Sequence, residues 1–120
     1  MHIALIDDNE IDIFVNTKLL ETSQITADID SYLNPLVALD TLCEKYIDII
    51  IVDNQMPEIS GYGFLEKIIA CKGDSLPIMI VLTASVHADL KVKYEGLHDD
   101  IKLWEKPLNV EALSALLAQA

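Results

Sequence analysis

Residues 47–61 read IDIIIVDNQMPEISG, and this stretch decides the fold class. It opens on an apolar run interrupted only by Asp48, which is typical of a parallel strand that is covered on both faces. The run leads directly into Asp53, and Pro57 and Gly61 then mark a loop. A charge directly after a buried strand indicates a side chain at the edge of a sheet, where we expect the cost of burying Asp53 to be modest.

Four further apolar runs have the length and composition of strands, and helical spacing appears between them. The five expected strands cover residues 2–6, 26–32, 47–52, 77–82 and 101–104. Strands that alternate with helices predict a parallel sheet with right-handed connections and helices on both faces. We therefore expect an α/β fold, with one domain over residues 1–120 and no output domain.

Apolar side chains at three- to four-residue spacing predict which face of each helix covers the sheet. The clearest stripes are Ile11, Phe14, Val15 and Leu19; Leu39, Leu42, Cys43 and Tyr46; and Leu65, Ile68 and Ile69. Asp8 precedes a helix expected over residues 10–22 and is a candidate for its N-cap. The segment 86–97 has the weakest helical pattern, and Gly96 is a candidate for its end.

The composition argues against several classes of partner. Twenty acidic residues against eight lysines, without any arginine, give a formal charge of −12. Nucleic acid and anionic membrane surfaces both favour cationic proteins, so neither is an expected partner. The longest apolar stretch, residues 76–86, is too short to span a membrane, and the N-terminus meets acid too soon for a signal peptide. We therefore expect a cytoplasmic location.

The chain has two cysteines, Cys43 and Cys71, in segments with helical patterns. They are far apart in sequence and form no CxxC motif, so a redox motif is not indicated. A free cysteine is among the most frequently buried residue types. We therefore expect two separate buried thiols.

Polar side chains end four of the five expected strands, at the edge where ligands bind in open parallel sheets. In strand order the residues that follow or end these strands are Asp7 and Asp8; Asp53; Thr83 and Ala84; and Glu105, Lys106 and Pro107. The carboxylates of the three aspartates, the threonine hydroxyl and the lysine should therefore converge on one edge. Unpaired carboxylates this close would raise one another's pKa, so a hard divalent cation is the expected occupant: Mg²⁺, with Mn²⁺ as an alternative.

These residue types suit phosphoryl transfer. A carboxylate beside a cation can attack phosphorus and form an aspartyl-phosphate. Lys106 would then neutralise non-bridging oxygens, and the Thr83 hydroxyl would donate to another. Each residue alone has a simpler role, since acids cap helices, threonines cap turns, and a lysine before proline is usually solvated. Only the joint arrangement favours a functional site.

The motifs IDD at 6–8, DNQMP at 53–57 with Gly61 beyond it, LTA at 82–84 and EKP at 105–107 resemble the receiver domains of two-component response regulators. The resemblance covers essentially the whole chain, which is close in size to single-domain, chemotaxis-type members. It implies a flavodoxin-like fold with strand order 2-1-3-4-5.

The same resemblance implies the role of each site residue. It implies Asp53 as the phosphoacceptor; Asp7, Asp8, Asp53 and the backbone carbonyl of Gln55 as metal ligands; Thr83, Ala84 and Lys106 as phosphoryl-binding and switch residues; and a cis bond before Pro107. The family usually has Tyr or Phe three residues before the lysine, but this chain has Leu103, with Trp104 next to it. Strand alternation puts these two side chains on opposite faces. The departure puts the usual coupling of the threonine to an aromatic side chain in question.

The resemblance implies a single-domain response regulator that accepts a phosphoryl group on Asp53 from a histidine kinase or a phosphotransfer protein. It would bind an unknown downstream protein, as a monomer or a phosphorylation-dependent dimer. It would be no enzyme beyond promoting its own phosphorylation and dephosphorylation.

Three alternatives remain. Leu103 is compatible with a receiver-like interaction module that works without phosphorylation. A phosphohydrolase of the haloacid-dehalogenase type would need a second Asp where Gln55 stands. A flavodoxin-like cofactor carrier would need a phosphate-binding loop after the first strand, and no Ser/Thr/Gly-rich segment follows it.

Overall fold

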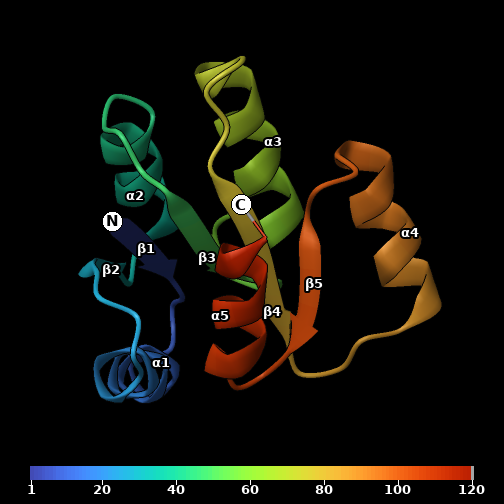
Figure 1. The fold of residues 1–120 in the computed structure, drawn as a ribbon. Helices are drawn as coiled ribbons and strands as arrows, with labels where there is room; N and C mark the ends of the chain where they lie inside the picture. The colour runs from blue at the N-terminus through green and yellow to red at the C-terminus, as the bar shows by residue number, and fades with distance from the viewer. Residues whose placement is uncertain (120) are drawn as a thin grey trace.

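The computed structural model describes residues 1–119, which form five successive βα units (Figure 1). The strands are β1 His2–Ile6, β2 Asp28–Tyr32, β3 Ile49–Asp53, β4 Ile78–Thr83 and β5 Lys102–Glu105. The helices are α1 Glu10–Thr22, α2 Pro35–Leu42, α3 Gly61–Lys72, α4 Ala88–Leu97 and α5 Val110–Ala118. No helix within residues 1–119 has the length and hydropathy needed to cross a membrane.

All five strands run parallel in one sheet, in the order β2-β1-β3-β4-β5. This order confirms the expected fold class and puts β3, with its buried run IIIV, at the centre. β3 and β4 each extend one residue beyond the expected runs, so Asp53 and Thr83 lie inside strands and pair with their neighbours. Gly96 lies inside α4 and does not end it, because the helix continues to Leu97.

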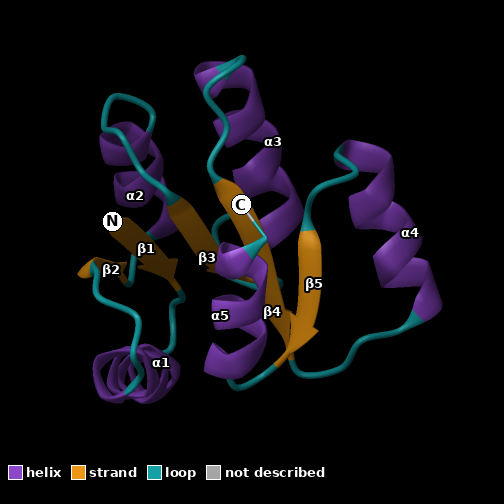
Figure 2. Cartoon of the chain, viewed as in Figure 1, coloured by secondary structure: helices purple, strands orange, loops and turns teal. Residues whose placement is uncertain are grey.

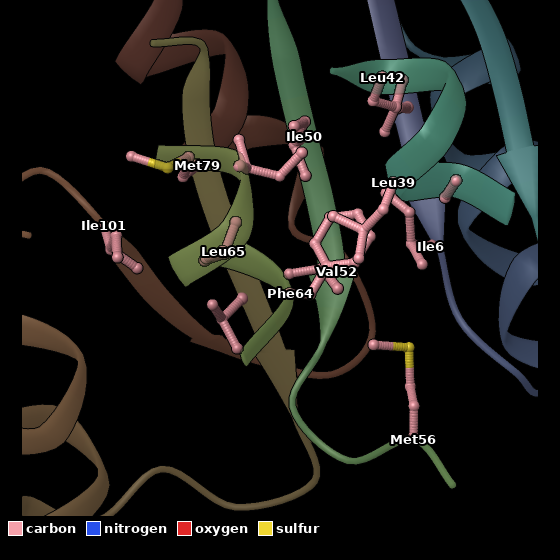
Figure 3. Close-up of a cluster of buried hydrophobic side chains, with 14 of the residues drawn as sticks. Ile6, Leu39, Leu42, Ile50, Val52, Met56, Phe64, Leu65, Met79 and Ile101 are labelled. Atoms are coloured by element: carbon pink, nitrogen blue, oxygen red, sulfur yellow. The ribbon is translucent and has the colours of Figure 1, made fainter. Parts of the chain in front are cut away.

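Helices cover both faces of the sheet (Figure 2). α2, α3 and α4 pack on one face, and the close-up in Figure 3 shows part of this cluster. Its members include Ile6, Ile50, Val52, Leu39, Leu42, Phe64, Leu65 and Met79. α1 and α5 cover the other face, where Leu20 and Leu113 pack against Leu5, Ile51 and Leu82. Burying an apolar side chain of this size stabilises the fold by about 1.5–3 kcal/mol, so these two clusters hold the strand ends in position.

α1 faces the sheet only partly through the expected residues, because Leu19 packs against the core but Val15 is exposed. Ile11 and Phe14 are 71% and 62% exposed, whereas Asn16 and Leu20 are the buried residues of the helix. Asn16 is buried because its side-chain oxygen accepts a hydrogen bond at 3.1 Å from the backbone N–H of Leu108. A polar anchor thus sets the rotation of α1, which an apolar pattern cannot reveal.

Two smaller expectations about the helices are also wrong. Asn9, and not Asp8, caps α1: its side-chain oxygen accepts from the backbone N–H groups of Ile11 and Asp12. The second apolar stripe ends early, because α2 stops at Leu42 and Tyr46 lies beyond it, exposed to solvent.

Cys43 and Cys71 form a disulfide, so the expectation of two separate thiols is wrong. Cys43 is the C-cap of α2 and Cys71 lies in the last turn of α3, and their Cα atoms are 5.7 Å apart. α2 and α3 lie on the same face of the sheet, and their C-terminal ends therefore meet. Sequence spacing does not show this proximity, because the two cysteines belong to different βα units.

Reducing this disulfide should lower the free energy of unfolding by about 2 kcal/mol, the lower end of the usual range, because α2 and α3 also pack through their apolar side chains. Urea unfolding with and without dithiothreitol measures the difference. The double variant Cys43→Ser with Cys71→Ser should match the reduced protein and be insensitive to dithiothreitol. An unchanged urea midpoint after verified reduction would show that the bond contributes nothing to stability.

Candidate functional site

The sheet brings the sequence-predicted polar residues to one edge. Asp7 follows β1, Asp53 and Thr83 end β3 and β4, and Lys106 follows β5. Backbone hydrogen bonds continue past the strand ends: the N–H of Asp7 donates to Tyr32 at 3.1 Å, and the N–H of Lys106 donates to Thr83 at 2.8 Å. The side chains at this edge are therefore held by sheet-like backbone pairing, although several belong to loops.

The three carboxylates predicted as metal ligands form a compact group. Asp7, Asp8 and Asp53 each offer an oxygen, and these oxygens lie within 4.8 Å of one another. Asp8 is exposed, but Asp53 is only 8% exposed. The expectation that burial of Asp53 costs little is therefore wrong, and burial raises the pKa of its carboxyl despite the opposing hydrogen bond from Lys106.

Asp7 is the most strongly perturbed acid of the group. It is 4% exposed, and burial raises its pKa to about 6, against the hydrogen bond that its side chain accepts from the backbone N–H of Asn9 at 2.9 Å. The charge of Asp53 raises the pKa of Asp7 further. Carboxylate oxygens crowded in this way are the donors that hard divalent cations prefer, so the group fits a divalent metal ion.

Within residues 1–119, Lys106 is the one cation that pairs with these acids. Its Nζ lies 2.9 Å from Oδ1 of Asp53, 2.7 Å from Oδ2 of Asp12 and 3.5 Å from Oδ2 of Asp7. Burial alone would lower the pKa of Lys106, but its hydrogen bonds to Asp12 and Asp53 raise it, so the side chain is charged at neutral pH. The peptide bond between Lys106 and Pro107 is cis.

Asp12 is a site residue that the sequence analysis missed. It lies in the first turn of α1, where an acid is commonly found because it interacts favourably with the helix N-terminus. Its position in the sequence could have indicated a role at the site, because a helix that follows Asp7 and Asp8 begins at the same edge of the sheet. The rotation of α1, set by Asn16, turns Asp12 toward Lys106.

A pocket of about 320 Å³ opens beside Asp53. Its lining consists of Asp53, Asn54, Gln55, Thr83, Ala84, Ser85, His87, Leu90 and Lys106. The Thr83 hydroxyl is buried and donates to the carbonyl of Ser85 at 3.3 Å, a long distance for a hydroxyl donor. This hydroxyl is therefore free to exchange its weak contact for a stronger acceptor in the pocket.

A buried tyrosine joins α4 to the loop after Asp53. Tyr94 is 1% exposed, and its hydroxyl donates to the side-chain oxygen of Asn54 at 2.7 Å. Asn54 is further held by its N–H, which donates to Leu82, and by its carbonyl, which accepts from Gly61. This link was not predicted from the sequence, because the weak helical pattern of α4 does not indicate that Tyr94 is buried.

Leu103, at the position where an aromatic residue was expected from the resemblance, and its neighbour Trp104 pack on opposite faces of the sheet. Leu103 packs on the side of α2, α3 and α4, whereas Trp104 packs on the side of α1 and α5. Strand alternation accounts for the split. The aromatic side chain that hydrogen-bonds to the loop after Asp53 is Tyr94 of α4.

The fold and the site together define a doubly wound α/β domain with an acidic, lysine-containing pocket at the carboxyl ends of its strands. The family model described as the response regulator receiver domain matches residues 3–118. The chain therefore belongs to the family of response regulator receiver domains. Receiver domains are signalling modules that interact with histidine kinases or phosphotransfer proteins.

Solved structures show the same fold. A two-component response regulator from Cytophaga hutchinsonii is 25% identical, with a TM-score of 0.84 over 98% of this chain and 94% of that one. The chemotaxis protein CheY4 of Vibrio cholerae is 21% identical, with a TM-score of 0.78 over 98% and 96%. A Burkholderia pseudomallei response regulator with a phosphorylated aspartic acid, a calcium ion and citrate is 24% identical, with a TM-score of 0.78 over 95% and 64%. Comparison with curated protein sequences gives no match.

Proposed function

We propose that this chain is a response regulator receiver domain that is phosphorylated on Asp53. The observation that carries the proposal is the position of Lys106: its ammonium lies 2.9 Å from Asp53, in a pocket that Thr83 also lines. The phosphorylated aspartic acid of the Burkholderia relative is consistent with this assignment.

In the proposed reaction an Asp53 oxygen attacks the phosphorus of a phosphohistidine on a kinase or phosphotransfer protein. The new O–P bond forms as the P–N bond breaks, and the released imidazole takes up a proton. Lys106 binds a non-bridging oxygen, and the Thr83 hydroxyl exchanges its long contact with Ser85 for another. Ala84 and Ser85 line the same pocket.

Asp7, Asp8 and Asp53, with the backbone carbonyl of Gln55, would hold Mg²⁺ or Mn²⁺. A bound divalent cation neutralises charge on the acids and on the phosphoryl oxygens. Burial is the main cause of the high pKa of Asp7, and the charge of Asp53 adds to it, so a bound cation would stabilise the ionised carboxylates.

The phosphorylated form would bind a downstream protein through a shifted population of surface conformations, as a monomer or a dimer. The expected cytoplasmic location stays a prediction. The alternative, an interaction module independent of phosphorylation, rests on Leu103 and is opposed by the full set of polar residues in the pocket.

Intact mass after incubation with acetyl phosphate tests the proposal. With Mg²⁺ the native chain should gain one phosphoryl group, and the adduct should be absent with EDTA and in Asp53→Asn. Asp74→Asn, which alters an exposed acid outside the site, serves as the matched control and should gain the group. An unmodified native chain with intact Mg²⁺ binding would favour the phosphorylation-independent module.

A further inference from the structure

Asp12 is the nearest carboxylate to Lys106. The Nζ–Oδ2 distance is 2.7 Å, against 2.9 Å to Asp53 and 3.5 Å to Asp7. Both Lys106 and Asp12 are partly buried, so solvent and salt screen this ion pair less than a pair on the open surface. The ammonium is therefore shared between the proposed phosphoacceptor and a residue of α1.

Two contacts one helical turn apart connect α1 to the segment after β5. Asp12 binds Lys106, and Asn16 accepts a hydrogen bond from the N–H of Leu108. Residues four apart lie on the same face of a helix, so the two contacts act on the same three-residue segment. Asn16 is buried and neutral, so it keeps the segment anchored when the charge of Asp12 is removed.

We propose that Asp12 is a positioning residue that competes with the incoming phosphoryl group for the Lys106 ammonium and thereby slows the phosphorylation of Asp53. This inference rests on the proposed function. The phosphoryl oxygens need the same ammonium donors that Asp12 occupies, so the carboxylate competes with them. Its negative charge also repels an anionic phosphoryl donor at the pocket, which acts in the same direction.

The test compares Asp12→Asn with a control that has the same change in net charge. Asn keeps the size and an acceptor oxygen, so the variant removes the charge and retains the shape. Glu10→Gln is the matched control, because Glu10 lies in the same first turn, is exposed, and has no ion pair within residues 1–119.

With acetyl phosphate and saturating Mg²⁺, Asp12→Asn should be phosphorylated about three- to tenfold faster than the native chain. Glu10→Gln should differ from the native chain by less than about twofold, because an exposed charge is screened. Initial rates of adduct formation by intact mass, at constant ionic strength, provide the comparison.

Beryllofluoride, a non-covalent stand-in for the phosphoryl group, gives a readout that does not depend on chemistry. The Kd for beryllofluoride in the presence of Mg²⁺ should fall in Asp12→Asn by about the same factor, and remain unchanged in Glu10→Gln. A purely structural role for Asp12 would change the urea midpoint and leave this Kd unchanged.

Equal rates for Asp12→Asn and Glu10→Gln, or a slower rate for Asp12→Asn, would overturn the inference, and the proposed function would stand as long as the native chain is phosphorylated. Absence of any adduct in the native chain would overturn both. A faster Asp12→Asn with a lower beryllofluoride Kd would establish the competition for Lys106.

Discussion

Replacing Gly61 with alanine should destabilise the domain by about 3 kcal/mol, the upper end of the usual cost of overpacking, because the added methyl group meets backbone. A Cβ at this position would lie 2.6 Å from the carbonyl oxygen of Asp53 and 2.8 Å from the hydroxyl of Tyr94. It would also lie 3.1 Å from the Cα of Asn54. The start of α3 and the end of β3 cannot both keep their positions, so we expect a large shift of the urea midpoint.

Gly96→Ala is the matched control for this substitution. A Cβ at Gly96 meets nothing within 4 Å, and the residue lies inside α4. Alanine should therefore stabilise the chain by about 0.5–1 kcal/mol through its higher helix propensity. A Gly61→Ala variant as stable as the native chain would show that the approach of α3 to Asp53 is not tight.

Asp7→Asn should stabilise the cation-free protein by about 3 kcal/mol near neutral pH. Burial raises the pKa of Asp7 from 3.8 to about 6, so the folded chain holds the proton more tightly than the unfolded chain between these values. The stability from the protonated form is fully present below about pH 4 and is lost as the pH rises through about 6. Asparagine has no titrating carboxyl group, so the variant does not lose this stability. The free energy of unfolding of both proteins in EDTA, measured across the pH range, tests the prediction.

In the presence of Mg²⁺ the native chain should be more stable than Asp7→Asn, which is the reverse of the order expected without the cation. The cation stabilises the native chain in proportion to its binding, whereas Asp7→Asn has lost a proposed ligand and should gain little. Asp74→Asn, at an exposed position, should follow the native curve in both conditions. Equal stabilisation of the native chain and Asp7→Asn by Mg²⁺ would exclude Asp7 as a ligand.

The architecture was predictable from sequence because its main signal is local. A strand that is buried on both faces has an uninterrupted apolar run, and the residues IIIV before Asp53 form such a run. The features that sequence did not show include two contacts between residues that are distant in the chain. Asn16 turns α1 by binding Leu108, and the Cys43–Cys71 bond joins two helices that only the folded chain brings together.

The candidate site was likewise predictable in part. Residues at strand ends converge by topology, so Asp7, Asp53, Thr83 and Lys106 could be placed at one edge without coordinates. Their environments could not be foreseen, because pairing of Asp53 within β3 determines its burial, and the rotation of α1 determines the approach of Asp12. The local sequence thus shows which chemical groups lie at the site, but their burial, ion pairs and pKa values depend on the folded chain.

The bond between Tyr94 and Asn54 has a thermodynamic consequence for signalling. Leu90 and Tyr94 are the only buried residues of α4 in the described chain. Leu90 lines the pocket beside Asp53, and Tyr94 donates a hydrogen bond to Asn54, the residue after Asp53. Under the proposed function, a protein that displaces α4 would break contacts beside the pocket that a phosphoryl group on Asp53 would enter. Coupling free energies are reciprocal, so the factor by which phosphorylation changes the affinity of such a protein equals the factor by which that protein changes the equilibrium of phosphorylation.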